Sequence, residues 1–221
     1  MIKAIIFDMD GVIIDSVGFH YDIWKRIAEK YGAELSYNDF KESLNGMSTP
    51  ETSVKLIRMF NINASKEEIT AEKWALIKKS IGMMPLFEGA KETIKTFKRL
   101  GYKIGLGTSA RRELTELSLG PNLEDIEFDA VVTSDDVKHT KPYPDIFLKC
   151  AEMLIVKPEE CAVIEDAKNG ITAAKKAGMK AIGVTTTSEP EDLKEADIIV
   201  QSIKDVNNDL IKKIEGEKHN G

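Results

Sequence analysis

AIIFDMDGVIIDS, residues 4–16, is the stretch that decides the fold. Its apolar start, residues 4–7, predicts a buried strand, and that strand ends at a carboxylate, Asp8. Asp10 follows two residues later, and Gly11 allows a sharp turn. Two acids at the end of a buried strand cost desolvation and mutual repulsion, which a bound cation and an electrophile would offset. The alternative is a polar turn, because Asp and Gly are common turn residues.

The composition is that of an ordinary globular protein. Its 221 residues are enough for a core domain and a small second domain, with 42% hydrophobic and 31% charged residues. A net charge of -6 gives no basic surface for nucleic acid and argues against binding anionic membranes. We find no membrane span or signal peptide, and Cys150 and Cys161 stand in apolar surroundings typical of reduced core residues. We expect a cytoplasmic monomer without nucleic-acid or membrane partners.

Helical patterns fill residues 16–87, and no good strand pattern interrupts them. Thr49 and Pro50 suit the N-cap and first position of a helix, and residues 65–68, SKEE, form a capping-box pattern. We predict a helical-bundle domain inserted after the first strand. A bundle that simply packs on the core would give a similar pattern.

Residues 88–215 alternate between helix and strand. Strands are expected at 102–107, 130–133, 161–164, 181–184 and 197–200. This alternation predicts a parallel sheet with helices on both faces. The predicted fold class is therefore α/β, with a Rossmann-like parallel sheet core of residues 1–15 and 88–215 and a helical cap domain of residues 16–87. The tail, residues 215–221, has the composition of a disordered segment.

Reactive side chains follow several of these strands. Thr108 and Ser109 follow the second strand, Lys141 comes after the third, and the pair 165–166, Glu-Asp, ends the fourth. Each piece alone suits a helix cap or a turn, but ligands of open parallel sheets bind beyond the carboxyl ends of the strands. Carboxylates suit Mg²⁺, and a lysine and a hydroxyl suit a phosphoryl group. The set together favours phosphoryl transfer. A G-x-x-x-x-G-K-[ST] loop is absent, so nucleotide hydrolysis by that route is not indicated.

This ordered set resembles the haloacid dehalogenase superfamily, specifically its phosphotransferases with a helical cap. Residues 8–12, DMDGV, match the first motif, Thr108 the second, Lys141 the third and residues 165–166 the fourth. The resemblance covers nearly the whole chain. It is strongest to the group of β-phosphoglucomutases and phosphoglycolate phosphatases, whose likeness extends to His20, Trp24 and the segment 141–147, KPYPDIF.

The resemblance implies roles for these residues. Asp8 would attack phosphorus, and Asp10 would be the general acid and base. The implied catalytic residues are Asp8, Asp10, Thr108 and Lys141. The implied Mg²⁺ ligands are Asp8, Asp10 through its backbone carbonyl, Asp166, and Glu165 in or beside the shell. The implied substrate contacts are Ser109, Ala110, Arg111, His20, Asn45, Gly46 and Ser48.

We expect a Mg²⁺-dependent phosphatase acting on a small phosphorylated metabolite such as a sugar phosphate. The alternative is a mutase of the β-phosphoglucomutase type, which must hold a second phosphate. In β-phosphoglucomutases the cap loop carries a Lys and an Arg, whereas residues 45–49, NGMST, contain neither. Lys73, Arg111 or Arg112 could supply the missing charge, so the sequence leaves this choice open.

Proteins of other classes share parts of this pattern. A phospho-signalling receiver module also uses a phosphorylated Asp, Mg²⁺, a hydroxyl and a Lys, but its acids lie on different strands and it lacks a helical insertion. A dehalogenase needs no metal and lacks the second Asp, so Asp10 and residues 165–166 argue against it. A catalytically dead binding protein is possible in principle, but no motif is missing.

Overall fold

The computed structural model describes residues 1–45, 47–80, 82, 84–120 and 123–216, so Gly46 and the tail beyond 216 lie outside the described residues. The chain divides into two compact units, which are Met1–Asp15 with Pro85–Gly221, and Ser16–Met84. The boundary falls three residues before the expected one. The Asp15 amide donates to the Pro85 carbonyl and the Phe87 amide to the Ile13 carbonyl, each at 2.9 Å, so residues 85–87 belong with the first unit.

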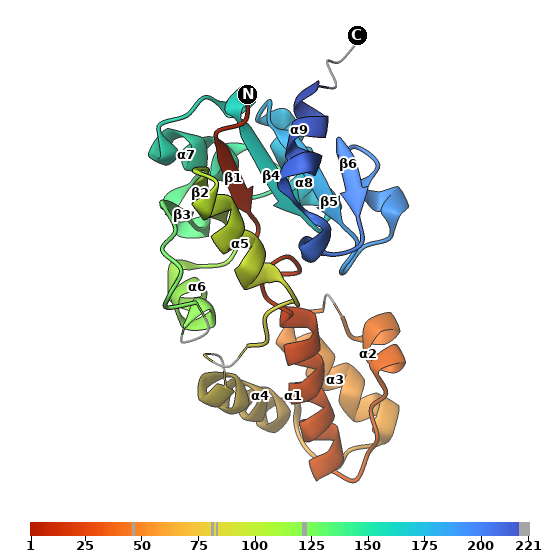
Figure 1. Ribbon diagram of the computed structural model, residues 1–221. Coiled ribbons are helices and arrows are strands. Elements are labelled where there is room, and N and C mark those ends of the chain that lie inside the picture. The colour runs from red at the N-terminus through yellow and green to blue at the C-terminus, as the bar shows by residue number, and fades with distance from the viewer. Residues whose placement is uncertain (46, 81, 83, 121–122, 217–221) are drawn as a thin grey trace. The chain divides into compact units, whose positions relative to one another are not determined.

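The first unit is built on a parallel six-stranded sheet of order β3-β2-β1-β4-β5-β6 (Figure 1). The strands are β1 (Ala4–Phe7), β2 (Lys103–Gly107), β3 (Ala130–Val132), β4 (Cys161–Glu165), β5 (Lys180–Val184) and β6 (Ile198–Val200). All four residues of β1 are fully buried, because β1 lies between β2 and β4 and both faces are covered. The predicted α/β class and its parallel sheet are confirmed.

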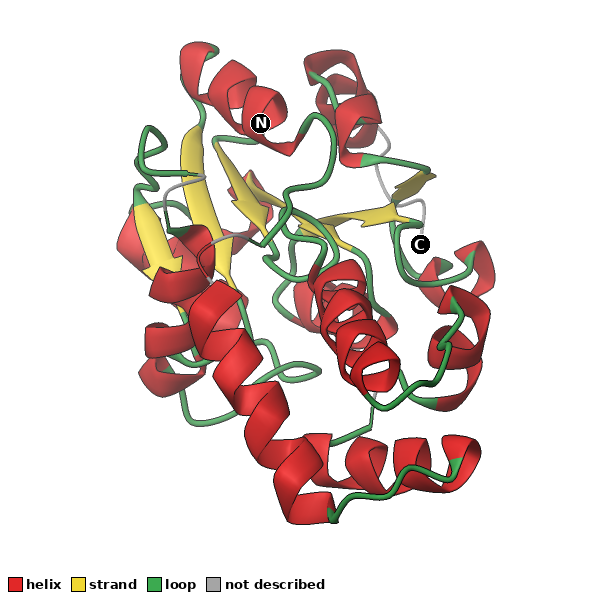
Figure 2. Ribbon diagram, turned by 90° about the horizontal axis from the view of Figure 1, so that it is seen from below, coloured by secondary structure: helices red, strands yellow, loops and turns green. Residues whose placement is uncertain are grey.

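Helices cover both faces of this sheet (Figure 2). The helices of the first unit are α5 (Ala90–Arg99), α6 (Arg112–Leu119), α7 (Asp145–Leu154), α8 (Lys168–Lys176) and α9 (Asn208–Gly216). On one face, α7 packs on β1, β2 and β3, and α8 packs on β4 and β5. Cys150 and Cys161 are free and buried in the core between them. On the other face lie α5 and α9, in front of the sheet in Figure 1. Shorter 3-10 turns cover Ser134–Asp136, Pro158–Glu160, Pro190–Leu193 and Ile203–Asp205.

The second unit is helical throughout its described residues. Its helices are α1 (Ser16–Lys30), α2 (Tyr37–Ser43), α3 (Thr49–Phe60) and α4 (Lys66–Ser80). The α4 helix packs on both α1 and α3. The N-cap of α3 is Ser48 and not the expected Thr49, because the Ser48 amide and hydroxyl both donate to the Glu51 carboxylate, at 3.0 and 2.5 Å.

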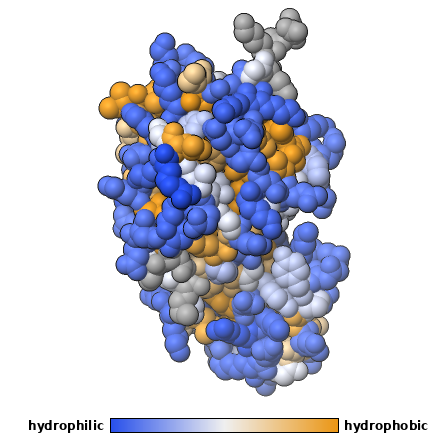
Figure 3. Space-filling model, in the orientation of Figure 1, coloured by the Kyte–Doolittle hydropathy of each residue, from blue (hydrophilic) through white to orange (hydrophobic). Residues whose placement is uncertain are grey.

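None of the helices that the structure describes combines the length and the apolar character needed to cross a bilayer. The face drawn in Figure 3 is largely hydrophilic, with smaller apolar areas between the hydrophilic side chains.

Candidate active site

The candidate site lies at the carboxyl ends of β1 and β4, where the order of the strands reverses. The chain adds β2 and β3 on one side of β1, then β4, β5 and β6 on the other. Phe7 pairs with Ile164, and the Asp8 amide donates to the Ile164 carbonyl at 3.0 Å. Asp8 and Glu165, the next residues of their strands, therefore emerge side by side. Open parallel sheets usually bind ligands at such a reversal.

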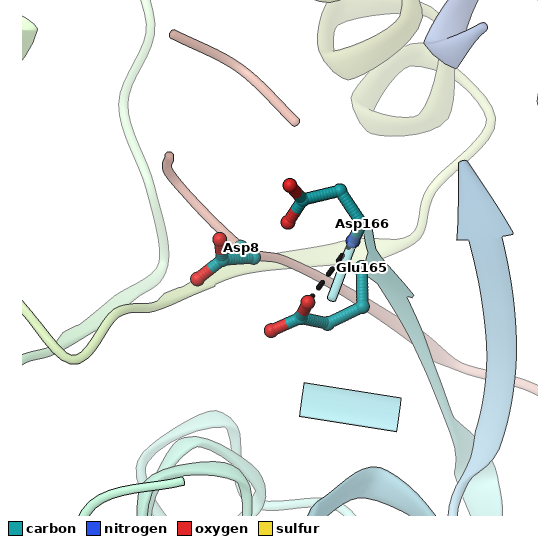
Figure 4. Close-up of side chains that lie close together, drawn as sticks. All are labelled: Asp8, Glu165 and Asp166. Carbon is teal, nitrogen blue, oxygen red and sulfur yellow. Dashed lines mark hydrogen bonds between the residues drawn. The ribbon is translucent and has the colours of Figure 1, made fainter. Parts of the chain in front are cut away.

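Three buried carboxylates meet at this point, from Asp8, Glu165 and Asp166 (Figure 4). One oxygen from each lies within 4.8 Å of the others, and the residues are 6%, 1% and 5% exposed. Glu165 Oε2 accepts hydrogen bonds from the backbone amides of Asp166 and Ala167, each at 3.0 Å. These two donors fix the orientation of the Glu165 carboxylate.

Lys141 supplies the positive charge of the cluster. Its ammonium donates to Asp8 Oδ1 and, at 2.6 Å, to Glu165 Oε1. Its Nζ also lies 4.8 Å from the centre of the Phe147 ring. Three carboxylates against one ammonium leave two negative charges in a buried place, and carboxylate oxygens are the ligands that hard divalent cations prefer. The cluster therefore fits Mg²⁺, which Asp8, Glu165 and Asp166 would hold.

Two glycines allow the acids to come this close. Gly11 has a φ of +79°, and a Cβ there would lie 1.9 Å from Asp166 Oδ2. A Cβ at Gly170 would lie 1.8 Å from Glu165 Oε1. Any side chain at either position would displace a carboxylate of the cluster.

Burial controls the proton affinities in this cluster. Burial raises the pKa of Asp8 well above its ordinary value, and the nearby Lys141 offsets only part of the effect. Burial and the neighbouring Glu165 raise the pKa of Asp166 to about 7. Burial alone would lower the pKa of Lys141, but the carboxylates of Asp8 and Glu165 outweigh it and raise that pKa. A divalent cation would favour the ionised carboxylates.

A cleft of about 410 Å³ opens beside these groups, and it collects most of the expected site residues of the first unit. Its lining consists of Asp8, Asp10, Thr108, Ser109, Ala110, Thr140, Lys141, Glu165, Asp166, Ala167, Asn169 and Gly170. Thr108 is buried, and its Oγ1 accepts a hydrogen bond from the Ala110 amide at 3.0 Å. The structure thus brings together the residues expected from all four motifs.

The two arginines after Thr108 differ in their partners. The Arg112 guanidinium donates to Asp136 Oδ2 at 2.6 Å, and the Arg112 amide donates to Asp135 at 2.9 Å. This pairing connects the loop after β2 to the turn after β3, and the Arg112 charge is compensated by Asp136. Arg111, the N-cap of α6, is exposed and is not among the cleft residues.

The sequence pattern did not indicate the threonines after β5 as site residues. Thr187 Oγ1 donates to Asp166 Oδ2, and Thr186 Oγ1 donates to the Gly11 carbonyl. The only sequence signal is the run of three threonines, 185–187, directly after the expected strand at 181–184. Asn169 and Thr140, which line the cleft, carried no signal at all.

The expected substrate residues His20, Asn45 and Ser48 lie in the second unit, and Gly46 lies outside the described residues. His20 is partly buried, its buried Nδ1 has no hydrogen-bond partner among the described residues, and burial lowers the pKa of His20 to about 4. Nearby, Lys73 is 5% exposed with its Nζ 4.3 Å from the centre of the Trp24 ring. Substrate contact by these residues stays a prediction.

The fold and the cleft are those of an α/β protein with a ligand site at the carboxyl ends of its strands. A family model of haloacid dehalogenase-like hydrolases matches residues 5–184, so the chain belongs to that family and the expected resemblance is confirmed. It is 35% identical over 218 residues to the β-phosphoglucomutase of Bacillus subtilis (strain 168), which covers 95% of this chain and 93% of that protein.

Two further comparisons agree with this assignment. The chain is 34% identical over 185 residues to a phosphorylated carbohydrates phosphatase of Thermotoga maritima, covering 81% of this chain and 83% of that protein. The crystal structure of a candidate β-phosphoglucomutase from Thermotoga maritima matches with a TM-score of 0.81 at 30% identity, covering 96% of this chain and 99% of that one.

Proposed function

We propose that this hydrolase is a Mg²⁺-dependent phosphatase of small phosphorylated metabolites, and that sugar phosphates are its substrate class. The observation that carries the proposal is the buried cluster of Asp8, Lys141, Glu165 and Asp166 in one cleft. The phosphatase of carbohydrates and the β-phosphoglucomutase among its relatives support phosphorylated sugars as substrates.

In the proposed reaction Asp8 is the nucleophile. A carboxylate oxygen of Asp8 attacks phosphorus, the bond from phosphorus to the ester oxygen breaks, and Asp10 gives that oxygen a proton. Asp10 then takes a proton from water, which attacks the aspartyl phosphate and releases inorganic phosphate. Lys141 and Thr108 bind the phosphoryl oxygens. The bound cation would neutralise charge on the phosphoryl group.

A phosphosugar mutase is the second candidate, and a specific observation favours it. A mutase needs a cation for the second phosphate, and Lys73 is buried without an ion pair or hydrogen bond to any described residue. Against it, the loop 45–49 carries no cation, and the Arg112 charge is already paired with Asp136. Arg111 is the other cation that remains available. The balance favours transfer to water.

Product analysis decides between the two. Purified enzyme is given β-glucose 1-phosphate, Mg²⁺ and a trace of the bisphosphate, and inorganic phosphate and glucose 6-phosphate are followed together. We expect inorganic phosphate to appear faster than glucose 6-phosphate. A panel of sugar phosphates then identifies the best substrate for phosphate release. Faster formation of glucose 6-phosphate would establish the mutase instead. Release of no phosphate from any ester of the panel, together with no mutase product, would refute both.

A further inference from the structure

The run of threonines at 185–187 makes three different contacts within the first unit. Thr185 Oγ1 donates to the Val200 carbonyl of the neighbouring strand β6, at 3.5 Å. Thr186 Oγ1 donates to the Gly11 carbonyl, and Thr187 Oγ1 donates to Asp166 Oδ2. One contact therefore belongs to the sheet edge, and two reach the loops that carry the acids.

The sheet register explains why this loop reaches the site. Gly183 of β5 pairs with Glu165 of β4, so the residues after β5 run beside Asp166, which directly follows β4. Asp166 also meets Gly11, where a Cβ would lie 1.9 Å from Oδ2 and 3.0 Å from Oδ1. Oδ2 of Asp166 therefore faces both a glycine that leaves room for it and a hydroxyl that donates to it.

We propose that Thr187 is a positioning residue for the divalent cation, acting through Asp166. Its hydroxyl orients the carboxylate plane and uses one lone pair of Oδ2, which leaves other lone pairs for a cation. Thr186 anchors the same loop to the turn after Asp10. This role rests on the proposed Mg²⁺-dependent function.

The chemical nature of the side chain that donates to Asp166 affects the charge of the cation site. A lysine at position 187 would orient Asp166 but would also cancel one of the two excess negative charges that attract the cation. A neutral hydroxyl orients the carboxylate without changing that charge. Second-sphere donors of this kind change metal affinity 10–100-fold when they are removed.

The test is direct binding of Mn²⁺ to the metal-free full-length enzyme, followed by electron paramagnetic resonance. Thr187→Val keeps the shape and removes the hydroxyl, Thr187→Ser keeps the hydroxyl, and Thr185→Val is the matched control in the same run. We expect Kd for Mn²⁺ to rise about 10–100-fold in Thr187→Val. Thr187→Ser and Thr185→Val should stay within about threefold of the wild type.

Turnover gives a second readout. In Thr187→Val the Mg²⁺ concentration for half-maximal rate should rise with Kd, while kcat at saturating Mg²⁺ is largely retained, a split that general destabilisation would not produce. Circular dichroism checks the fold, and Thr187→Ala replaces the valine variant if that one does not fold. Wild-type affinity in folded Thr187→Val or Thr187→Ala would overturn the positioning role alone. A wild-type enzyme that binds no Mn²⁺ would overturn the proposed function, and this inference with it.

Discussion

Lys141 in the first unit and Lys73 in the second are both lysines whose side chain is largely buried and whose ammonium lies over an aromatic ring. Lys141 Nζ is 4.8 Å from the Phe147 centroid, and Lys73 Nζ is 4.3 Å from the Trp24 centroid. Among the described residues only Lys141 of the two also contacts carboxylates, those of Asp8 and Glu165.

The carboxylate contacts of Lys141 reverse the effect that burial has on the pKa of a lysine. The pKa of Lys141 is raised because its carboxylate partners outweigh burial, whereas burial lowers the pKa of Lys73 to about 8. The Lys141 charge belongs to a site that still has an excess of negative charge and calls for a cation. The Lys73 charge is uncompensated among the described residues and suits an anion. The carboxylates of Asp8 and Glu165 therefore account for the opposite directions of the two pKa shifts.

Removal of a carboxylate beside Lys141 should give the largest effect. We expect Asp8→Asn to lose phosphatase activity by roughly 10⁴-fold or more, because the amide cannot act as the nucleophile. Phosphate release in Mg²⁺ measures this, with circular dichroism to check the fold. Exposed Asp192→Asn is the matched control. Substantial turnover by Asp8→Asn would remove Asp8 from its proposed role.

Substitution of Asp10 tests an acid that follows β1, as Asp8 does, but lies outside the three-carboxylate cluster. Asp10→Asn should slow hydrolysis of a sugar phosphate by about 10²–10⁴-fold, the usual contribution of general acid–base catalysis. Formation of the aspartyl phosphate from an aryl phosphate, whose leaving group needs no proton, should slow less and is the internal control. Equal losses with both substrates would point to a role other than proton transfer.

The burial of Asp166 beside Glu165 predicts an unusual pH dependence of stability. The pKa of Asp166 rises from 3.8 to about 7 on folding, so the folded metal-free chain binds its proton more tightly than the unfolded chain. Its free energy of unfolding should therefore fall as pH rises from about 4 to 7, by on the order of 1–3 kcal/mol.

Urea unfolding at pH 5 and pH 8 measures this fall, and Mg²⁺ should reverse it at pH 8 by binding the folded state. In Asp166→Asn both the fall and the Mg²⁺ effect should shrink. Stability that rises with pH in the metal-free wild type, and does so equally in Asp166→Asn, would contradict the raised pKa of Asp166.

Removal of the uncompensated charge of Lys73 should give the smallest effect, a change in stability. Lys73→Met keeps the length of the apolar stem and removes the ammonium, so it should stabilise the ligand-free protein by about 1–2 kcal/mol at neutral pH. Since the folded-state pKa of about 8 lies below the unfolded value of 10.5, the wild type should regain this difference as pH rises through that window. Thermal unfolding of Lys73→Met and of exposed Lys78→Met tests it, and destabilisation by Lys73→Met would show that the charge has a partner.

The sequence determined the fold class and the order of the site elements. An apolar run that stops at Asp8, followed by alternating helices and strands, is a local pattern that reports burial on both faces of a parallel strand. The strand-end residues Thr108, Lys141 and Glu165 could be listed for the same reason, since carboxyl ends of parallel strands share one edge. The N-cap of α3 was placed one residue late, because Ser48 and Thr49 both suit that position.

Only the tertiary structure decided which of these groups touch. Lys141 lies 133 positions from Asp8 along the chain, Thr186 lies 175 from Gly11, and Arg112 lies 24 from Asp136. Such pairs follow from strand order and register, which place β2 and β4 beside β1, β3 beside β2, and β5 beside β4, and so join segments that no local periodicity relates. The sequence does not predict the burial of Lys73 either, because a lysine on a helix is expected to be exposed to solvent. The packing of α1 and α4 buries it.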